Sequence, residues 1–293
     1  MTTTSQPQAS EPQNAALWQP AQQDLDRPAS SRVQEALLGG DAHTWALDRI
    51  LAEQITAALR RAPAITATHR KFRTRAIDTA LTHGLRQFID IGTGIPTHQP
   101  IHELIADHGA AHVVYVDNDP LAVHGTRLIL DDVTGGEPPS HVDVQIGDFF
   151  YPATILGGSQ VSESIDLREP VCLVLTGLLE YCPNWRDPAA VVEHYRTQLA
   201  PGSFIILTHP TVDGLDLGDA RHAQLASDAH RAAACYDVTA TPMVLRGRAE
   251  FESLTAELDL VGGGVAYTAS WPDPGDVRAA ADSLCLAAVG VVP

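Results

Sequence analysis

The chain has 293 residues, 44% of them hydrophobic, which is enough for one substantial α/β domain with a smaller appendage. Its formal charge of −17, from 36 acidic side chains against 19 Lys and Arg, disfavours nucleic acids and anionic membranes as partners. The chain has neither a signal peptide pattern nor the run of roughly 20 apolar residues that spans a bilayer, so we expect a cytoplasmic protein.

The N-terminal part of the chain changes character after its first residues. Residues 1–27 are rich in Gln, Ser, Thr, Ala and Pro and have no hydrophobic period, which predicts a disordered tail. A helical period begins near Ser31, is interrupted at Gly39 and Gly40, and then continues until Pro63, which we expect to end the helix.

A third N-terminal helix is predicted over residues 67–83. It carries a group of basic side chains, which we interpret mainly as a solvated face, with anion binding as the alternative: His69, Arg70, Lys71, Arg73 and Arg75. The segment 28–84 is expected to form a helical lid over the domain that follows, with Gly39 at its bend.

From residue 85 to 293, strand and helix patterns alternate. This order predicts an α/β, Rossmann-like fold, with a mostly parallel sheet of seven strands and helices on both faces. The last two strands, over 258–269 and 283–292, are expected to form an antiparallel pair at the sheet edge. The five strands before them are predicted at 87–92, 112–117, 142–147, 171–177 and 203–208.

The ends of the first two predicted strands carry a pattern typical of nucleoside pockets. The run Asp90-Ile91-Gly92-Thr93-Gly94 predicts a buried strand that turns sharply, with glycines that let a ligand lie against the backbone. Asp117 ends the second strand, where a carboxylate can bind both ribose hydroxyls. Asp90 would repel a pyrophosphate, and Pro96 stands where the dinucleotide fingerprint needs its third glycine. The pattern therefore favours the cationic S-adenosylmethionine over NAD.

Several short segments, in their order along the chain, resemble an actinobacterial family of S-adenosylmethionine-dependent methyltransferases. This family was long catalogued as of unknown function. The resemblance covers about residues 28–275 and is carried by Leu37-Leu38-Gly39-Gly40, by Asp90 to Thr97 and by Asp117-Asn118-Asp119-Pro120. It implies the class I methyltransferase fold and S-adenosylmethionine as cofactor, but no acceptor. Glu180 stands where many relatives carry histidine, so the acceptor side differs from theirs.

Within this pocket, chemistry assigns provisional roles to single residues. Asp90 would hold the methionine ammonium, or alternatively cap the next helix, while Gly92, Thr93 and Gly94 lie along the cofactor. Asp117 would bind the ribose. Asn118 would steady the loop or the adenosine, or alternatively cap the helix that begins at Pro120.

The remaining cofactor assignments lie on other strand ends and on the lid. Asp148 and Phe149 would clamp the adenine, although Phe149 fits the core equally well. Thr176 and Gly177 end the fourth strand beside the cofactor. Arg32 would meet the methionine carboxylate, or alternatively form a surface ion pair.

Methyl transfer to a phenol, a hydroxyl or an amine needs a base, for which Glu180, His209 and His43 are the candidates, Glu180 first. We expect no metal, because His98 and His102 lack a third ligand at a convincing spacing. The sequence thus predicts a methyltransferase for a small molecule in specialised metabolism. Transfer or cyclisation of the aminocarboxypropyl arm, and a cofactor-binding regulator without turnover, remain the alternatives.

Overall fold

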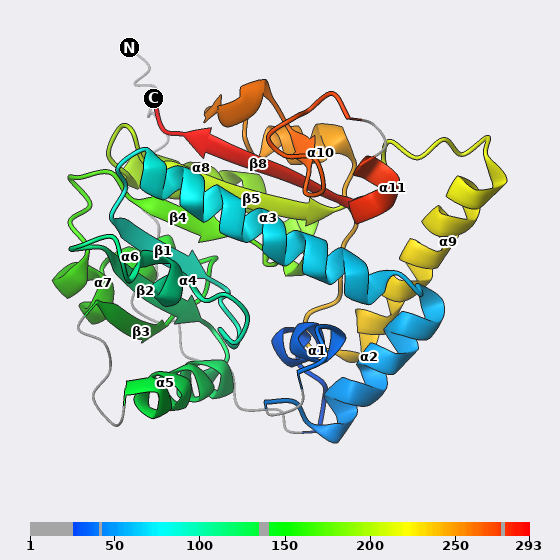
Figure 1. Cartoon of the computed structure of the whole chain (residues 1–293), viewed down its shortest axis with the longest axis horizontal. Helices are drawn as coiled ribbons and strands as arrows, with labels where there is room; N and C mark the ends of the chain where they lie inside the picture. The colour runs from blue at the N-terminus through cyan, green and yellow to red at the C-terminus, as the bar shows by residue number, and fades with distance from the viewer. Residues whose placement is uncertain (1–25, 41–42, 135–140, 277–278) are drawn as a thin grey trace, which may run out of the picture.

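A mixed β-sheet forms the centre of the computed structural model, with helices on both faces (Figure 1). The structure describes residues 26–40, 43–134, 141–276 and 279–293, so residues 1–25 of the predicted tail lie outside it. The strands are β1 Gln87–Ile91, β2 His112–Asp117, β3 Val142–Ile146, β4 Cys172–Leu175, β5 Phe204–Pro210, β6 Asp259–Leu260, β7 Ala266–Tyr267 and β8 Cys285–Val291.

The strand order is β3-β2-β1-β4-β5-β8-β6, and β7 also pairs with β8. The first five strands are parallel, and β8 runs antiparallel to β5, which confirms the predicted mostly parallel sheet, although the described residues form eight strands in place of the predicted seven. The last two strands differ from the prediction, because β8 enters between β5 and β6. The apolar run 258–269 is split into β6 and β7, since Gly262 and Gly263 between them adopt positive φ angles of 79° and 84°.

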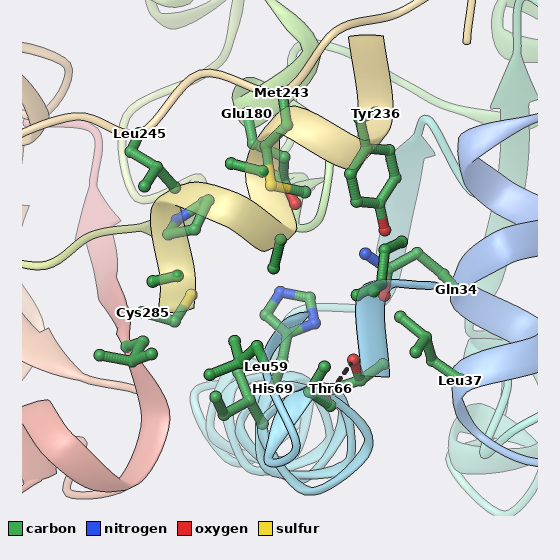
Figure 2. A pocket seen from close by; sticks show the side chains of 18 of the residues that line it. Gln34, Leu37, Leu59, Thr66, His69, Glu180, Tyr236, Met243, Leu245 and Cys285 are labelled. Carbon is green, nitrogen blue, oxygen red and sulfur yellow. Dashed lines mark hydrogen bonds between the residues drawn. The ribbon is translucent and has the colours of Figure 1, made fainter. Parts of the chain in front are cut away.

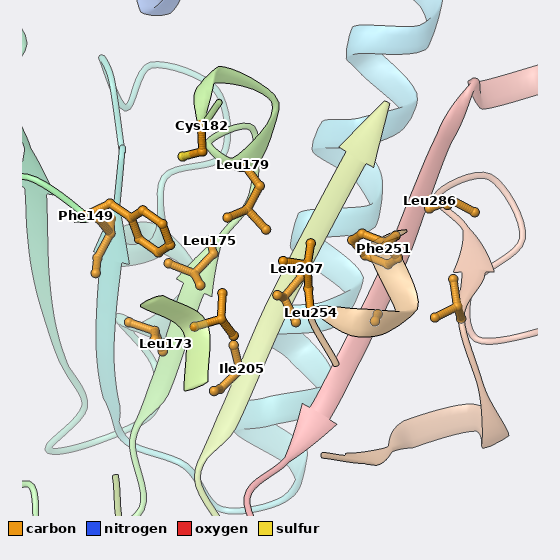
Figure 3. Close-up of a cluster of buried hydrophobic side chains, with 14 of the residues drawn as sticks. Phe149, Leu173, Leu175, Leu179, Cys182, Ile205, Leu207, Phe251, Leu254 and Leu286 are labelled. Atoms are coloured by element: carbon orange, nitrogen blue, oxygen red, sulfur yellow. The ribbon is translucent and has the colours of Figure 1, made fainter. Parts of the chain in front are cut away.

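Helices cover both faces of the parallel strands, and β2, β4 and β5 accordingly consist mainly of apolar residues. Figure 3 shows one face, where alternate side chains such as Leu173, Leu175 and Leu207 meet Phe149 and Phe251. The helices are α1 Ser30–Leu37, α2 Ala46–Ala58, α3 Ala62–Thr82, α4 Ile101–Ile105, α5 Pro120–Thr134, α6 Pro152–Leu156, α7 Ser159–Ser164, α8 Pro188–Gln198, α9 Ala220–Ala234, α10 Arg248–Ser253 and α11 Ala279–Ser283.

The N-terminal helices divide differently from the prediction. Pro63 lies in the first turn of α3 and does not end α2, because a missing N–H has no cost at a helix start. Phe72, Ile77 and Ala80 of α3 are buried with Phe88 of β1, and α3 crosses the sheet in Figure 1. The last helix of the predicted lid, α3, therefore belongs to the helical layer on the sheet. No helix within the described residues is long and apolar enough to cross a membrane.

Candidate active site

Asp90 is fixed at the carboxyl end of β1 by two hydrogen bonds. Its Oδ2 accepts from Arg73 Nη2 at 2.6 Å and from Thr93 Oγ1 at 2.9 Å. Asp90 is 2% exposed and Arg73 is 4% exposed. Asp90 does not cap a helix, since α4 begins only at Ile101. Its other carboxylate oxygen, Oδ1, is therefore the one that could receive a cationic ligand group.

The loop after β1 lies in a tight space between two neighbouring segments. Gly92 and Gly94 have φ angles of 73° and 62°, which disfavour any other residue. A Cβ on Gly92 would come within 2.8 Å of Leu178 Cδ1, and one on Gly94 within 2.9 Å of Ser31 Cβ. The loop thus packs between the segment after β4 and the start of α1.

Asp117 is held at the end of β2 by backbone donors. Its Oδ2 accepts from Gly94 N at 2.8 Å and its Oδ1 from Asp119 N at 2.9 Å. Burial raises the pKa of this carboxyl to about 6. Asn118 is exposed, and the helix cap predicted for it is formed by Asp119, whose Oδ1 accepts from Leu121 N at 2.9 Å.

Arg32 pairs with Asp48 of α2 and stacks on Trp45. Its Nε donates to Asp48 Oδ2 at 2.8 Å, and the guanidinium lies 4.1 Å from the centre of the Trp45 ring. The side chains of Arg32 and Asp48 are both buried, so the alternative of a surface ion pair for Arg32 is wrong. Arg32 Nη1 also lies 3.6 Å from Asp119 Oδ2, which directs the guanidinium toward the end of β2. Gly39, which follows α1, has open space around it, because no atom would lie within 4 Å of a Cβ at this position.

At the end of β3, Asp148 Oδ1 accepts from Phe150 N at 2.9 Å. The ring of Phe149 is buried and stacks on Tyr195, with 5.6 Å between ring centres and 20° between planes. Phe149 therefore contributes to the core, as the sequence allowed.

Thr176 and Gly177 follow β4 beside a residue that the sequence did not assign to the site, His69 of α3. Thr208 Oγ1 accepts from Gly177 N at 3.0 Å and is hydrogen-bonded to His69 Nε2 at 2.8 Å. A Cβ on Gly177 would lie 3.4 Å from His69 Cε1 and 3.9 Å from Glu180 Oε1. The turn after β4 thus brings His69 and Glu180 together.

These two residues line a cavity of about 110 Å³, which we call the Glu180 cavity. Figure 2 shows His69 projecting into it from α3, with Glu180, Met243 and Tyr236 on the opposite side. The rest of the lining comes mainly from α1, α2, α3 and α9 and is mostly apolar: Gln34, Leu37, Ile55, Leu59, Ala62, Ile65, Thr66, Pro210, Thr211, Ala229, Ala232, Ala233, Leu245, Leu284 and Cys285.

Glu180 is 5% exposed, and among the described residues its Oε2 has no hydrogen-bond partner. Burial raises the pKa of its carboxyl to about 7. The backbone carbonyl of Glu180 accepts from Val244 N at 2.7 Å, which holds the segment carrying Met243 and Leu245 against the cavity. The structure therefore presents a buried carboxylate oxygen with unused acceptor capacity.

The two other candidate bases lie in different surroundings. The ring of His209 donates from Nδ1 to Pro210 O at 2.9 Å, while its Nε2 accepts from Arg246 Nη1. Burial lowers its pKa to about 4. With both nitrogens engaged, His209 is unsuited to act as a base. His43 lines a second cavity with Pro96, Thr97 and His102, which shares no lining residue with the Glu180 cavity.

The two histidines considered for a metal lie near different protein groups. His102 Nδ1 is 3.0 Å from the Tyr115 hydroxyl, and His98 Nε2 is 3.6 Å from Glu35 Oε1. Within the described ranges, no group of three or more His, Cys, Asp or Glu residues is arranged to hold a metal ion.

The solvated face predicted for α3 is wrong for four of its five basic residues. Lys71 is exposed, but Arg73 is buried and the others are partly buried. Arg75, for example, donates from Nη2 to Thr268 O at 2.7 Å. The spacing of Thr66, His69 and Arg73 places them on one side of the helix, a signal available in the sequence.

A comparison with known proteins identifies the family of the chain. The family model described as S-adenosyl methyltransferase matches residues 16–293. The chain belongs to this family. As a methyltransferase it uses S-adenosylmethionine, and its strand order, with β8 antiparallel between β5 and β6, is typical of the class I fold. No curated protein matches the methyltransferase significantly.

Solved structures resemble the methyltransferase over most of its length. A DUF574 family protein from Streptomyces avermitilis has 26% identity and a TM-score of 0.79, covering 92% of this chain and 98% of its own. A putative methyltransferase from Thermobifida fusca has 29% identity and a TM-score of 0.78, covering 92% and 96%. Magnesium protoporphyrin IX methyltransferase from Synechocystis, solved with SAH, shares the fold at 11% identity and a TM-score of 0.50, covering 89% and 93%.

Proposed function

We propose that this methyltransferase modifies a small molecule held in the Glu180 cavity. The observation that carries this proposal is the position of an apolar cavity, with one buried carboxylate, directly beside the turn after β4. Enclosure by α1, α2, α3 and α9 suits a small molecule better than a polymer. The net charge of −17 supports the exclusion of nucleic acid.

The strand ends supply groups that fit each charged or polar part of S-adenosylmethionine. Asp117, already fixed by two backbone donors, would accept hydrogen bonds from the ribose hydroxyls. Asp90 would pair with the methionine ammonium. The positive φ angles of Gly92 and Gly94 let the loop after β1 turn sharply in the tight space between Leu178 and Ser31. When bound, the cofactor supplies an activated methyl group on a sulfonium.

For the methionine carboxylate we propose Arg70 in place of Arg32. Arg70 lies on α3 within electrostatic range of Asp90, Glu35 and Arg73. Burial and the neighbouring Arg73 lower its pKa to about 10, so an anionic partner would stabilise its charged form. Arg32 already has Asp48 and is directed toward the end of β2.

The cofactor and acceptor regions share their walls. Ser31 of α1 faces Gly94, while Gln34, one turn later, lines the Glu180 cavity. His69 lines the same cavity, and Arg70 follows it on α3. Because α1 and α3 border both regions, an acceptor in the cavity would face the methionine end of the cofactor, and the helices would exclude water from the reaction.

Calorimetric titration with S-adenosylmethionine, S-adenosylhomocysteine and NAD tests the cofactor side without knowledge of the acceptor. Micromolar binding of the first two compounds without NAD is the expected result, and binding of NAD alone would overturn the proposal. With an acceptor in hand, release of S-adenosylhomocysteine indicates methyl transfer, whereas release of methylthioadenosine indicates transfer of the aminocarboxypropyl arm.

A further inference from the structure

We propose that the acceptor is a neutral phenol of single-ring size, whose hydroxyl donates a hydrogen bond to Oε2 of Glu180. This inference rests on the proposed methyl transfer in the Glu180 cavity. It names the class of substrate, which neither the family nor the related structures supply.

The size and lining of the cavity point to one apolar ring. Its volume of about 110 Å³ is of the same order as an engineered protein cavity of about 150 Å³ that binds benzene. Leu37, Ile55, Leu59, Ile65 and Met243 present aliphatic or thioether surface to the cavity. Such a lining binds a flat apolar body and offers little to a sugar or another polyhydroxylated compound.

The hydroxyl is required by Glu180. A buried carboxylate oxygen without a donor is costly, because folding has removed it from water and nothing within the described residues replaces that water. A ligand that carries one O–H group at the ring edge would supply the missing donor. A plain hydrocarbon would leave Oε2 without a partner and would bind less tightly.

The charges around the cavity favour a neutral ligand. Burial, followed by the nearby charges of Arg70 and Arg73, lowers the pKa of His69 to about 3, so this wall of the cavity disfavours a positive charge. A protonated amine would lose its hydration in the mostly apolar cavity, as a protonated His69 would. A carboxylate ligand would lie against Glu180, whose own charge repels it.

The acidity of the acceptor must match that of Glu180. A phenolic hydroxyl has a pKa of about 10, as in tyrosine, whereas that of water is about 15.7. Glu180, with its pKa raised to about 7, can accept a phenolic proton during the reaction far more easily than that of an aliphatic alcohol. As the phenol oxygen bonds to the methyl carbon, the carbon–sulfur bond breaks with its electrons going to sulfur, and the hydroxyl proton passes to Glu180.

The test compares toluene with three para-substituted derivatives of different polarity, on the protein saturated with S-adenosylhomocysteine. Calorimetric titration at pH 8 uses 4-methylphenol, toluene, 4-methylbenzylamine and 4-methylbenzoate. We expect 4-methylphenol to bind at least tenfold more tightly than each of the other three. The preference over toluene should disappear in Glu180→Leu, which keeps the size of the side chain and removes the acceptor.

A cavity-filling variant locates the binding site. Ala229 lines the cavity on α9, so Ala229→Leu should weaken 4-methylphenol binding at least tenfold, whereas Ala223→Leu on the exposed side of the same helix should change it less than twofold. Unchanged affinity for S-adenosylhomocysteine shows that each variant is folded.

The outcomes separate the two proposals. Equal binding of 4-methylphenol and toluene, tighter binding of the amine or the benzoate, or no binding of any ring compound would overturn the phenol assignment while the cofactor side stands. Failure to bind S-adenosylhomocysteine would overturn the proposed function, and the acceptor class with it.

Discussion

The guanidinium of Arg73 reaches from α3 to Oδ2 of Asp90 at the end of β1, over 2.6 Å, and both side chains are almost completely buried. The helix that covers one face of the sheet thereby also fixes the first acidic residue of the proposed cofactor site. The packing of α3 and the position of Asp90 depend on the same side chain.

Removing Arg73 should destabilise the whole domain. Arg73→Ala leaves the Asp90 carboxylate buried without its charged partner, which typically costs about 3–5 kcal/mol in the free energy of unfolding. Urea denaturation monitored by circular dichroism measures this value. Lys71→Ala, on the exposed side of the same helix, should change it by less than about 0.5 kcal/mol. A loss below about 1 kcal/mol for Arg73→Ala would contradict the buried pair.

Cofactor affinity should depend on pH through Asp117. The pKa of this carboxyl is raised from 3.8 to about 6, and the ribose hydroxyls need its ionised form as acceptor. Affinity for S-adenosylhomocysteine should therefore be constant above about pH 7 and fall as the pH drops below about 6, approaching tenfold for each pH unit. Calorimetry at several pH values measures it. Asp117→Asn should bind more weakly with no such dependence, and a flat wild-type profile would refute the assignment.

Arg70 should contribute to binding only when the ligand carries the methionine carboxylate. Arg70→Ala is expected to weaken S-adenosylhomocysteine binding by about 1.5–3 kcal/mol, the usual range for a hydrogen bond to a charged group. Affinity for methylthioadenosine, which lacks the carboxylate, should not change. Lys71→Ala is the matched control. An equal loss for both ligands would show that Arg70 acts on the fold and not on the carboxylate.

Glu180 should make the protein less stable at alkaline pH. Its pKa in the folded state is about 7 against an ordinary 4.5, so its favourable contribution is complete below about pH 4.5 and is lost as the pH rises to 7. At pH 8, Glu180→Gln should exceed the wild type in free energy of unfolding by about 3 kcal/mol, and this difference should shrink toward pH 4.5. Urea denaturation at pH 4.5, 6 and 8 checks the trend. A difference independent of pH would mean that Glu180 titrates normally.

The sheet could be predicted because its strands are buried on both faces. A short, continuous apolar run such as Phe204 to Leu207 is typical of a strand that is buried on both faces. The first five strands lie close to the predicted ranges. The position of β8 could not be predicted, since antiparallel pairing with β5 depends on contacts far apart in the sequence.

Within the candidate site, the sharp turn could be predicted because backbone geometry dictates the residue type at Gly92 and Gly94. The positions of the buried charged side chains could not be predicted, because a run of charged residues on a helix normally indicates a solvent-exposed face. Arg73 and Arg32 violate this rule, each with an acidic partner at least 16 residues away in the sequence. Only the folded chain brings Arg73 to Asp90 and His69 to Thr208.

The insertion of β8 between β5 and β6 also constrains how the protein is synthesised. β5 precedes β8 by about 75 residues of chain, so on the ribosome its free edge stays unpaired until that length has been translated. An exposed, apolar strand edge is an aggregation hazard. A nascent chain that ends before β8 would carry the complete loop after β1 but an open sheet edge at β5.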